Sequence, residues 1–220
     1  MWAIRIIVTL VMTAGTATGG GAEEALGIRP LLTMARQDLS RILPGDCQIL
    51  IEPRAIEQFL DGLDGTPPDW AQVYGRGHHD PDHDERLFTL NRERDAKRAG
   101  NPGVRQLIAF VWSGELSRYD ADAGGFHVAL GPEFTPTRWG VIRFKYEDLH
   151  GDLVAKTSEG LRSELEGRIA RSEVIEITVA MTGRLIPDES LVYDFSHDHE
   201  GLGVIMPVVR VERIDYLLTR

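Results

Sequence analysis

Hydrophobic residues recur with helical spacing in the first half of the chain. Between residues 30 and 99 they fall every three to four positions, which is typical of amphipathic helices. The predicted helices cover 30–43, 53–63 and 84–99. The third has acidic residues at its start and basic residues at its end, as the helix dipole favours.

Short apolar segments connect these helices. Residues 46–51 are predicted to form a short buried strand that includes Cys47, the only cysteine. Residues 69–75 are predicted to be irregular, with Trp70 and Tyr74 as anchors packed on the neighbouring domain. A single cysteine excludes an internal disulfide, and its apolar neighbours favour an inert, buried thiol over a reactive one.

The spacing changes to every second residue after Asn101-Pro102-Gly103, which predicts β-strands. The predicted order is strands at 106–119, 126–130 and 139–146, a helix at 158–171, and strands at 175–182 and 205–218. Gly114 is expected to bend the first of these strands. In the fourth, Ile177, Val179 and Met181 should face the core and Glu176 and Thr178 should face solvent. We therefore expect a helical and irregular region, 23–103, followed by a β-rich domain, 104–220.

This order of three strands, one helix and two strands resembles the OB-fold, a five-stranded Greek-key barrel. The segment Val179-Ala180-Met181-Thr182-Gly183-Arg184-Leu185 is similar to the fourth strand of the anticodon-binding-like OB group. The resemblance covers about residues 104–218 and implies an α+β protein with the helix between barrel strands 3 and 4. A lipocalin-like barrel needs more strands, and a sandwich does not need the helix.

The first 22 residues have the order of a secretory signal peptide. Arg5 precedes the apolar stretch 6–12, and small residues follow up to Ala22, after which cleavage is expected. The alternative, an uncleaved anchor, is disfavoured because Gly and Thr dilute the stretch from Thr13 onward. The sequence therefore predicts a periplasmic or secreted protein with no transmembrane segment after cleavage.

The charge balance bears on possible partners. The whole chain carries 24 basic and 34 acidic residues, and removal of the segment ending at Ala22 takes away one Arg and changes the net charge from -10 to -11. The charge balance therefore disfavours nucleic acid as a partner, because wide contact with phosphates requires a positive surface. A protein or small-molecule ligand in the cell envelope is the expected partner; the oligomeric state stays open.

Two clusters of imidazoles and carboxylates are candidate metal sites. The first spans 78–85 and includes His78, His79 and His83; the second includes Asp194, His197, His199 and Glu200. Zinc or another divalent transition metal accepts such ligands. Calcium fits the first cluster less well, because an EF-hand loop requires Gly at the position of Glu85. The competing interpretation of the first cluster is a solvated loop that caps the third helix. The competing interpretation of the second cluster is an exposed polar loop.

No motif identifies a reaction. The sequence lacks a Gly-x-Ser-x-Gly elbow, a Cys-x-x-Cys pair, a phosphate loop and a His-Glu-x-x-His motif. The favoured function is a non-enzymatic, exported binding or interaction module that uses the barrel face and the loop 187–203. The alternative is a metal-binding protein or metal-dependent hydrolase in which the two clusters share one ion. A third possibility is a structural envelope protein, which would need an exposed apolar patch.

Overall fold

The computed structural model describes residues 26–77, 80–147, 149, 151–196 and 201–219. The predicted signal segment 1–22 lies outside the described residues, as do His78, His79 and 197–200. Within the described ranges, none of the helices has both the length and the apolar character needed to span a bilayer.

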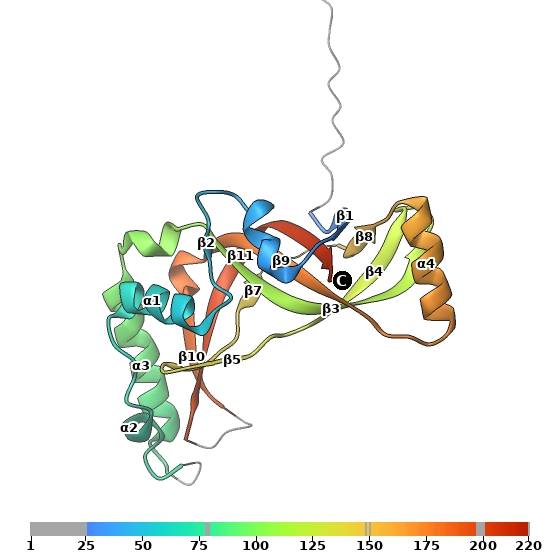
Figure 1. The fold of residues 1–220 in the computed structure, drawn as a ribbon. Coiled ribbons are helices and arrows are strands. Elements are labelled where there is room, and N and C mark those ends of the chain that lie inside the picture. Colours follow the sequence, from blue (N-terminus) through green and yellow to red (C-terminus); the bar gives the residue numbers. More distant parts are fainter. Residues whose placement is uncertain (1–25, 78–79, 148, 150, 197–200, 220) are drawn as a thin grey trace, which may run out of the picture.

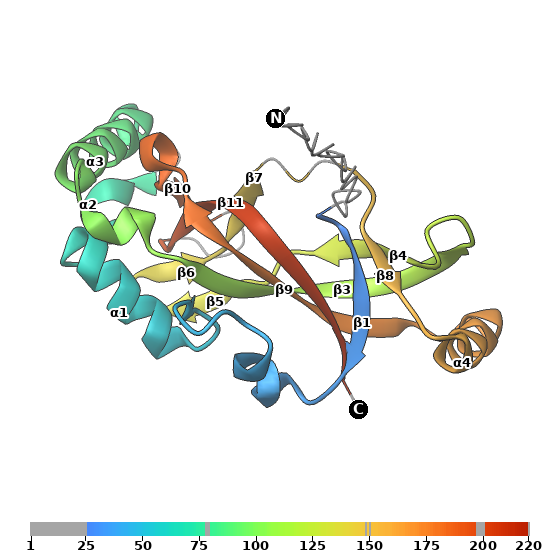
Figure 2. The same ribbon diagram turned by 90° about the horizontal axis from the view of Figure 1, so that it is seen from above.

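A closed barrel of six strands forms the centre of the molecule (Figures 1 and 2). In order around the barrel these are β1 (Ile28–Thr33), β8 (Val154–Lys156), β4 (Gly125–Gly131), β3 (Ile108–Asp120), β9 (Ile175–Leu185) and β11 (Gly203–Leu218). The barrel closes because β1 pairs in parallel with both β8 and β11. The α+β class and a closed barrel are consistent with an OB-like fold.

The details differ from the predicted five-strand barrel. The sixth strand, β1, comes from the 23–103 region. The predicted strand 139–146 is divided into β6 (Gly140–Ile142) and β7 (Lys145–Glu147), which both pair with β11 outside the six-strand ring. The barrel strand before α4 (Glu159–Ala170) is instead the three-residue β8, so the helix lies between the fourth and fifth barrel strands.

The predicted helix 30–43 is wrong. Its first residues belong to β1, and a 3₁₀ helix follows at Arg36–Arg41. Pro30 favours extended backbone for the residue before it, and long-range pairing with β8 and β11 fixes this conformation. Leu39 and Leu43, which gave the segment its helical spacing, are buried against the outer face of the barrel.

A smaller sheet extends from the first half of β11. It contains β6, β5 (Thr135–Thr137) and β10 (Leu191–Phe195), and β10 lies within the stretch predicted to be a loop. A further short strand, β2 (Gln48–Ile49), pairs with β3. Buried and half-buried side chains alternate along β10. The alternation typical of a strand is therefore present in the sequence, but it covers only five residues.

Three helices pack at the β10 end of the molecule (Figure 1). They are α1 (Pro53–Asp64), α2 (Trp70–Tyr74) and α3 (His83–Arg98). The predictions for α1 and α3 are confirmed, whereas the segment predicted to be irregular at 69–75 contains α2. Trp70 is an anchor, as predicted: its indole N–H donates to the carbonyl of Trp139 at 2.7 Å, and its ring lies against Gly203, where any Cβ would clash.

The barrel interior is filled with side chains. Ile177, Val179 and Met181 are buried, as their alternation predicted; Glu176 is exposed and Thr178 is half-buried. On the outer face a second apolar cluster forms where the segment after β1 covers one half of β3 and β9. The other half of that outer face lacks this cover, and the candidate site described below lies there.

Candidate functional site

His83 of the first predicted metal cluster packs against Phe195, the residue that follows Asp194 of the second. It is the first residue of α3 and is buried, with its ring stacked on Phe195 at a centroid distance of 3.8 Å. Tyr74 of α2 packs edge-on against both rings. Since Phe195 ends β10, the start of α3 and the end of β10 lie side by side.

The acidic residues of the first cluster have different roles. The His83 Nδ1 atom lies 3.0 Å from Asp84, and Asp80 forms an ion pair with Arg86 at 2.9 Å. Arg86 also donates to the carbonyl of Val73, so this pair fixes α2 against α3. The hydrogen bond from Arg86, followed by backbone N–H donors from Arg76 and Asp82, lowers the pKa of Asp80 well below its ordinary value.

Only Asp194 of the second cluster is described. It lies in β10 opposite Val204, and its carboxylate accepts from the backbone N–H of Phe195 at 2.8 Å. His197, His199 and Glu200 lie outside the described residues, as do His78 and His79. Among the residues that are described, no three side chains of His, Cys, Asp or Glu converge as metal ligands.

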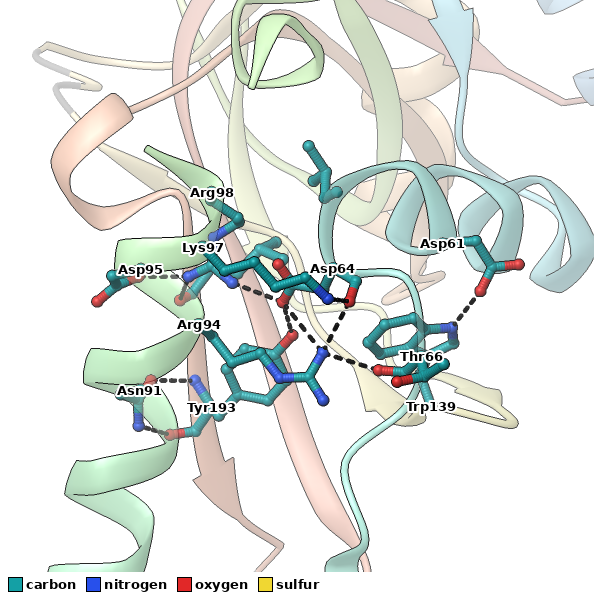
Figure 3. A network of polar contacts seen from close by, with 12 residues as sticks. Asp61, Asp64, Thr66, Asn91, Arg94, Asp95, Lys97, Arg98, Trp139 and Tyr193 are labelled. Atoms are coloured by element: carbon teal, nitrogen blue, oxygen red, sulfur yellow. Dashed lines mark hydrogen bonds and ion pairs between the residues drawn. The ribbon is translucent and has the colours of Figure 1, made fainter. Parts of the chain in front are cut away.

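A buried ionic network fastens α1 and α3 to β10 (Figure 3). Asp64, at the end of α1, is fully buried and accepts from Arg98 at 2.6 Å and from the Tyr193 hydroxyl. Arg98 also donates to Asp95 and Ser190. Burial, and then the Asp64 carboxylate, raises the pKa of Tyr193. Every charged member binds another part of the fold, so the network has a structural role.

One arginine and one lysine extend this network toward the surface. Arg94 donates to the carbonyls of Asp64 and Thr66 and lies over the rings of Trp139 and Tyr193 (Figure 3). Lys97 donates to the same Asp64 carbonyl. These cations donate hydrogen bonds to carbonyls at the end of α1 that lack partners within the helix, and positive charge near a helix C-terminus is favourable.

A groove of about 340 Å³ lies between α2 and α3. Its lining includes the apolar residues Val73 and Leu90 and the acidic residues Asp82, Glu85 and Glu93. Both arginines that line it, Arg86 and Arg94, are already bound to backbone carbonyls. The groove is therefore acidic, but it is also where the first turn of α3 places carboxylates for the helix dipole.

A larger hollow of about 690 Å³ opens on the barrel face. It crosses β4, β3 and β9 and reaches the end of β11 and Arg168 of α4; we call it the barrel-face hollow. Two cross-strand rows lie in it, Ser113 opposite Thr178 and Glu115 opposite Glu176. Ser113, Glu115 and Glu176 are exposed, in alternation with the buried Gly114 and Ile177.

Small residues make the hollow deep at β4. Gly131 lies opposite Ser113, and Ala129 lies opposite Glu115. Neither Gly131 nor Ala129 has a side chain that extends beyond Cβ, so the two rows stay uncovered and their hydroxyl and carboxylate groups are open to a ligand. Gly114, between the rows, faces the barrel interior, where a Cβ would lie 2.7 Å from Val179.

The barrel-face hollow and the described part of the segment 187–203 lie at opposite ends of β11. The hollow reaches Leu218 at the end of β11, whereas β10 pairs with residues 203–207 at its start. Those ends are separated by a strand of 16 residues, about 50 Å when extended. The sequence predicts both as the contact surface and does not indicate Glu115 or Glu176. The like-charged pair depends on register, which alternation alone does not give.

Comparisons with known proteins give no relative: the chain matches no protein-family model, no curated protein and no solved structure.

Proposed function

We propose that this protein is an exported, non-enzymatic binding module that receives an envelope partner in the barrel-face hollow. The observation that carries the proposal is the contrast between the two faces of β3 and β9. The inner face is closed by packed side chains, whereas the outer face offers about 690 Å³ lined by hydroxyl, carboxylate and apolar groups. Concave sites with a few polar groups on an apolar floor are typical of binding sites.

The segment 187–203 has a smaller part in this proposal. Its described residues form a short 3₁₀ helix at Pro187–Glu189 and the strand β10, which is held by α3. It supports the helical end of the molecule. The proposed contact surface is therefore the barrel face alone.

Site-specific photocrosslinking in the producing cell tests the proposal. A photoreactive residue at Ser113 should give crosslinks to a discrete envelope partner. The matched control is the same residue at Arg54, which is exposed on α1 outside the hollow. Equal crosslinking at both positions, or none at Ser113, would contradict the proposal.

Export is tested by the intact mass of the chain recovered from the envelope fraction. Loss of the first 22 residues is the expected result, because Gly20 and Ala22 are small residues at the positions that precede cleavage. A full-length chain in the cytoplasmic fraction would overturn the exported part of the proposal and would leave the hollow to be tested separately.

A second candidate function is binding of zinc or another divalent transition metal, with a metal-dependent hydrolase as its extension. The observation in its favour is the stack of His83 on Phe195, which brings the two His- and Asp-containing segments into contact. The proposed ligands are His197 and His199 with Asp194 or Glu200; a shared site would add His78, His79 or His83. Imidazole and carboxylate suit such an ion.

Thermal unfolding with added zinc tests this second candidate. Binding to the native state alone should raise the melting temperature, by the equivalent of about 2.7 kcal/mol at a hundredfold excess over Kd. The rise should disappear in the double variant His197→Ala/His199→Ala and weaken below about pH 6.5, where imidazole is protonated. Equal loss in His79→Ala would indicate a shared site. No response to zinc, copper or nickel would overturn the metal hypothesis.

A further inference from the structure

We infer that the barrel-face hollow docks an extended, basic segment of a partner protein, with an Arg or Lys side chain between Glu115 and Glu176. This inference rests on the proposed function and specifies the chemistry of the partner. It starts from the way the chain covers the outer face of β3 and β9 over only half of its length.

The covered half of that face is apolar. Ala109, Val111 and Ala180 pack there against Leu39 and Leu43, so the chain itself supplies the layer that excludes water. Two residues further along β3 the face becomes polar, at Ser113 and then at Glu115. The same outer face therefore continues without its cover, and the group that completes it must be polar.

The charge of the hollow selects a cation. Glu115 and Glu176 are direct cross-strand partners, and neither forms an ion pair with any residue that the structure describes. Arg168, the basic residue in the lining, is bound to Glu173 at 2.9 Å. Directly opposed like charges destabilise a sheet, and one guanidinium or ammonium placed between two carboxylates removes that repulsion.

The shape of the hollow favours an extended segment. Its two cross-strand rows are two residues apart along the strands, about 6.6 Å, which is also the spacing of same-side residues in an extended peptide. A segment that alternates basic and small residues has all its basic side chains on one side, so it can place one cation at the carboxylate row and the next beside Ser113 and Thr178, whose hydroxyl oxygens can accept hydrogen bonds from it. The small residues of β4 leave room for its backbone.

Titration of the mature protein with the peptide Ser-Arg-Ser-Arg-Ser-Arg, followed by backbone amide NMR shifts, tests the inference. The expected shifts are at 113–115 and 176–178. The variant Glu115→Gln/Glu176→Gln should weaken binding about three- to tenfold, as expected for two partly exposed ion pairs. The control Glu52→Gln/Glu189→Gln, which removes two exposed carboxylates elsewhere, should change binding less than about twofold.

The outcomes separate the two proposals. Equal weakening in the control variant, or equal binding of the peptide Ser-Gln-Ser-Gln-Ser-Gln, would overturn the basic segment; crosslinks from Ser113 would then still support the binding module. Crosslinks that disappear in Glu115→Gln/Glu176→Gln but persist in Glu52→Gln/Glu189→Gln would support both. The absence of crosslinks from Ser113 would overturn the proposed function itself.

Discussion

The side chain of Asn91 forms the two backbone hydrogen bonds with Tyr193 that a neighbouring strand would otherwise form. Its amide oxygen accepts from the Tyr193 backbone N–H at 2.8 Å, and its amide nitrogen donates to the Tyr193 carbonyl at 2.9 Å. Tyr193 is the central residue of β10, which pairs with β11 on its other edge. One helical side chain therefore satisfies both outward backbone groups of an edge strand, which would otherwise be open to wrong pairing.

Replacing Asn91 with Ala should lower the free energy of unfolding by about 1–3 kcal/mol, because two backbone groups lose their partners. Asn91→Asp should also destabilise, since a carboxylate cannot donate to the Tyr193 carbonyl. Urea unfolding measures both effects. The control is Gln72→Ala, an exposed side chain on α2 that should change stability by less than about 0.5 kcal/mol. Equal effects at both positions would contradict the role of Asn91.

The buried carboxylate of Asp64 gives a larger expected loss. Asp64→Asn should cost about 3–5 kcal/mol, because it removes the charge that faces Arg98 in the interior. Tyr193→Phe should cost about 1–3 kcal/mol through the lost hydroxyl donor. The two losses should not add in the double variant, because both act on the same carboxylate. Strict additivity in urea unfolding would show that the network does not act as a unit.

The sequence predicted those elements whose residues interact locally. Helices α1 and α3 and the strands β3, β4, β9 and β11 have enough residues for periodicity to identify them. It did not predict β1 and β8, because a three-residue strand such as β8 contains no measurable alternation and β1 depends on parallel pairing with residues more than 100 positions away. The helical spacing of Leu39 and Leu43 does not reflect an α-helix, because both residues pack on the outer face of the barrel.

The candidate sites show the same limit. The sequence indicated His83 and Asp194 by composition, and the structure brings their segments together through Phe195, which carries no metal-binding group. It did not indicate Glu115 and Glu176, because each is an ordinary polar residue of an alternating strand. Their relation is a property of register between β3 and β9, 61 positions apart in the chain.

The Asp80–Arg86 pair predicts a specific pH dependence. Hydrogen bonds lower the pKa of Asp80 in the folded state, so its contribution to stability is complete above its ordinary pKa of about 3.9 and is lost as the pH falls below that value. Asp80→Asn should therefore lower the melting temperature at pH 7. The difference from the parent protein should shrink progressively below about pH 4.

Melting curves from pH 7 downward test this dependence. The control is Asp122→Asn, an exposed aspartate in the β3–β4 turn, which should leave the curve close to that of the parent protein. A difference between Asp80→Asn and the parent that stays constant at all pH values would show that the substitution acts through packing instead of charge.

The Glu115–Glu176 pair predicts a substitution that stabilises the protein. Glu115→Lys turns a directly opposed like-charged pair into an attractive one, so the free energy of unfolding should rise by about 0.2–1 kcal/mol and the gain should shrink in high salt. A general effect of net charge, which is -10 in this chain, would give the same sign in the single variant. The double variant Glu115→Lys/Glu176→Lys distinguishes the two causes: it reduces the net negative charge further but restores a like-charged pair. If the local pair causes the gain, the double variant should lose it. A further increase in the free energy of unfolding in the double variant would show that the cross-strand pairing of Glu115 with Glu176 does not affect stability.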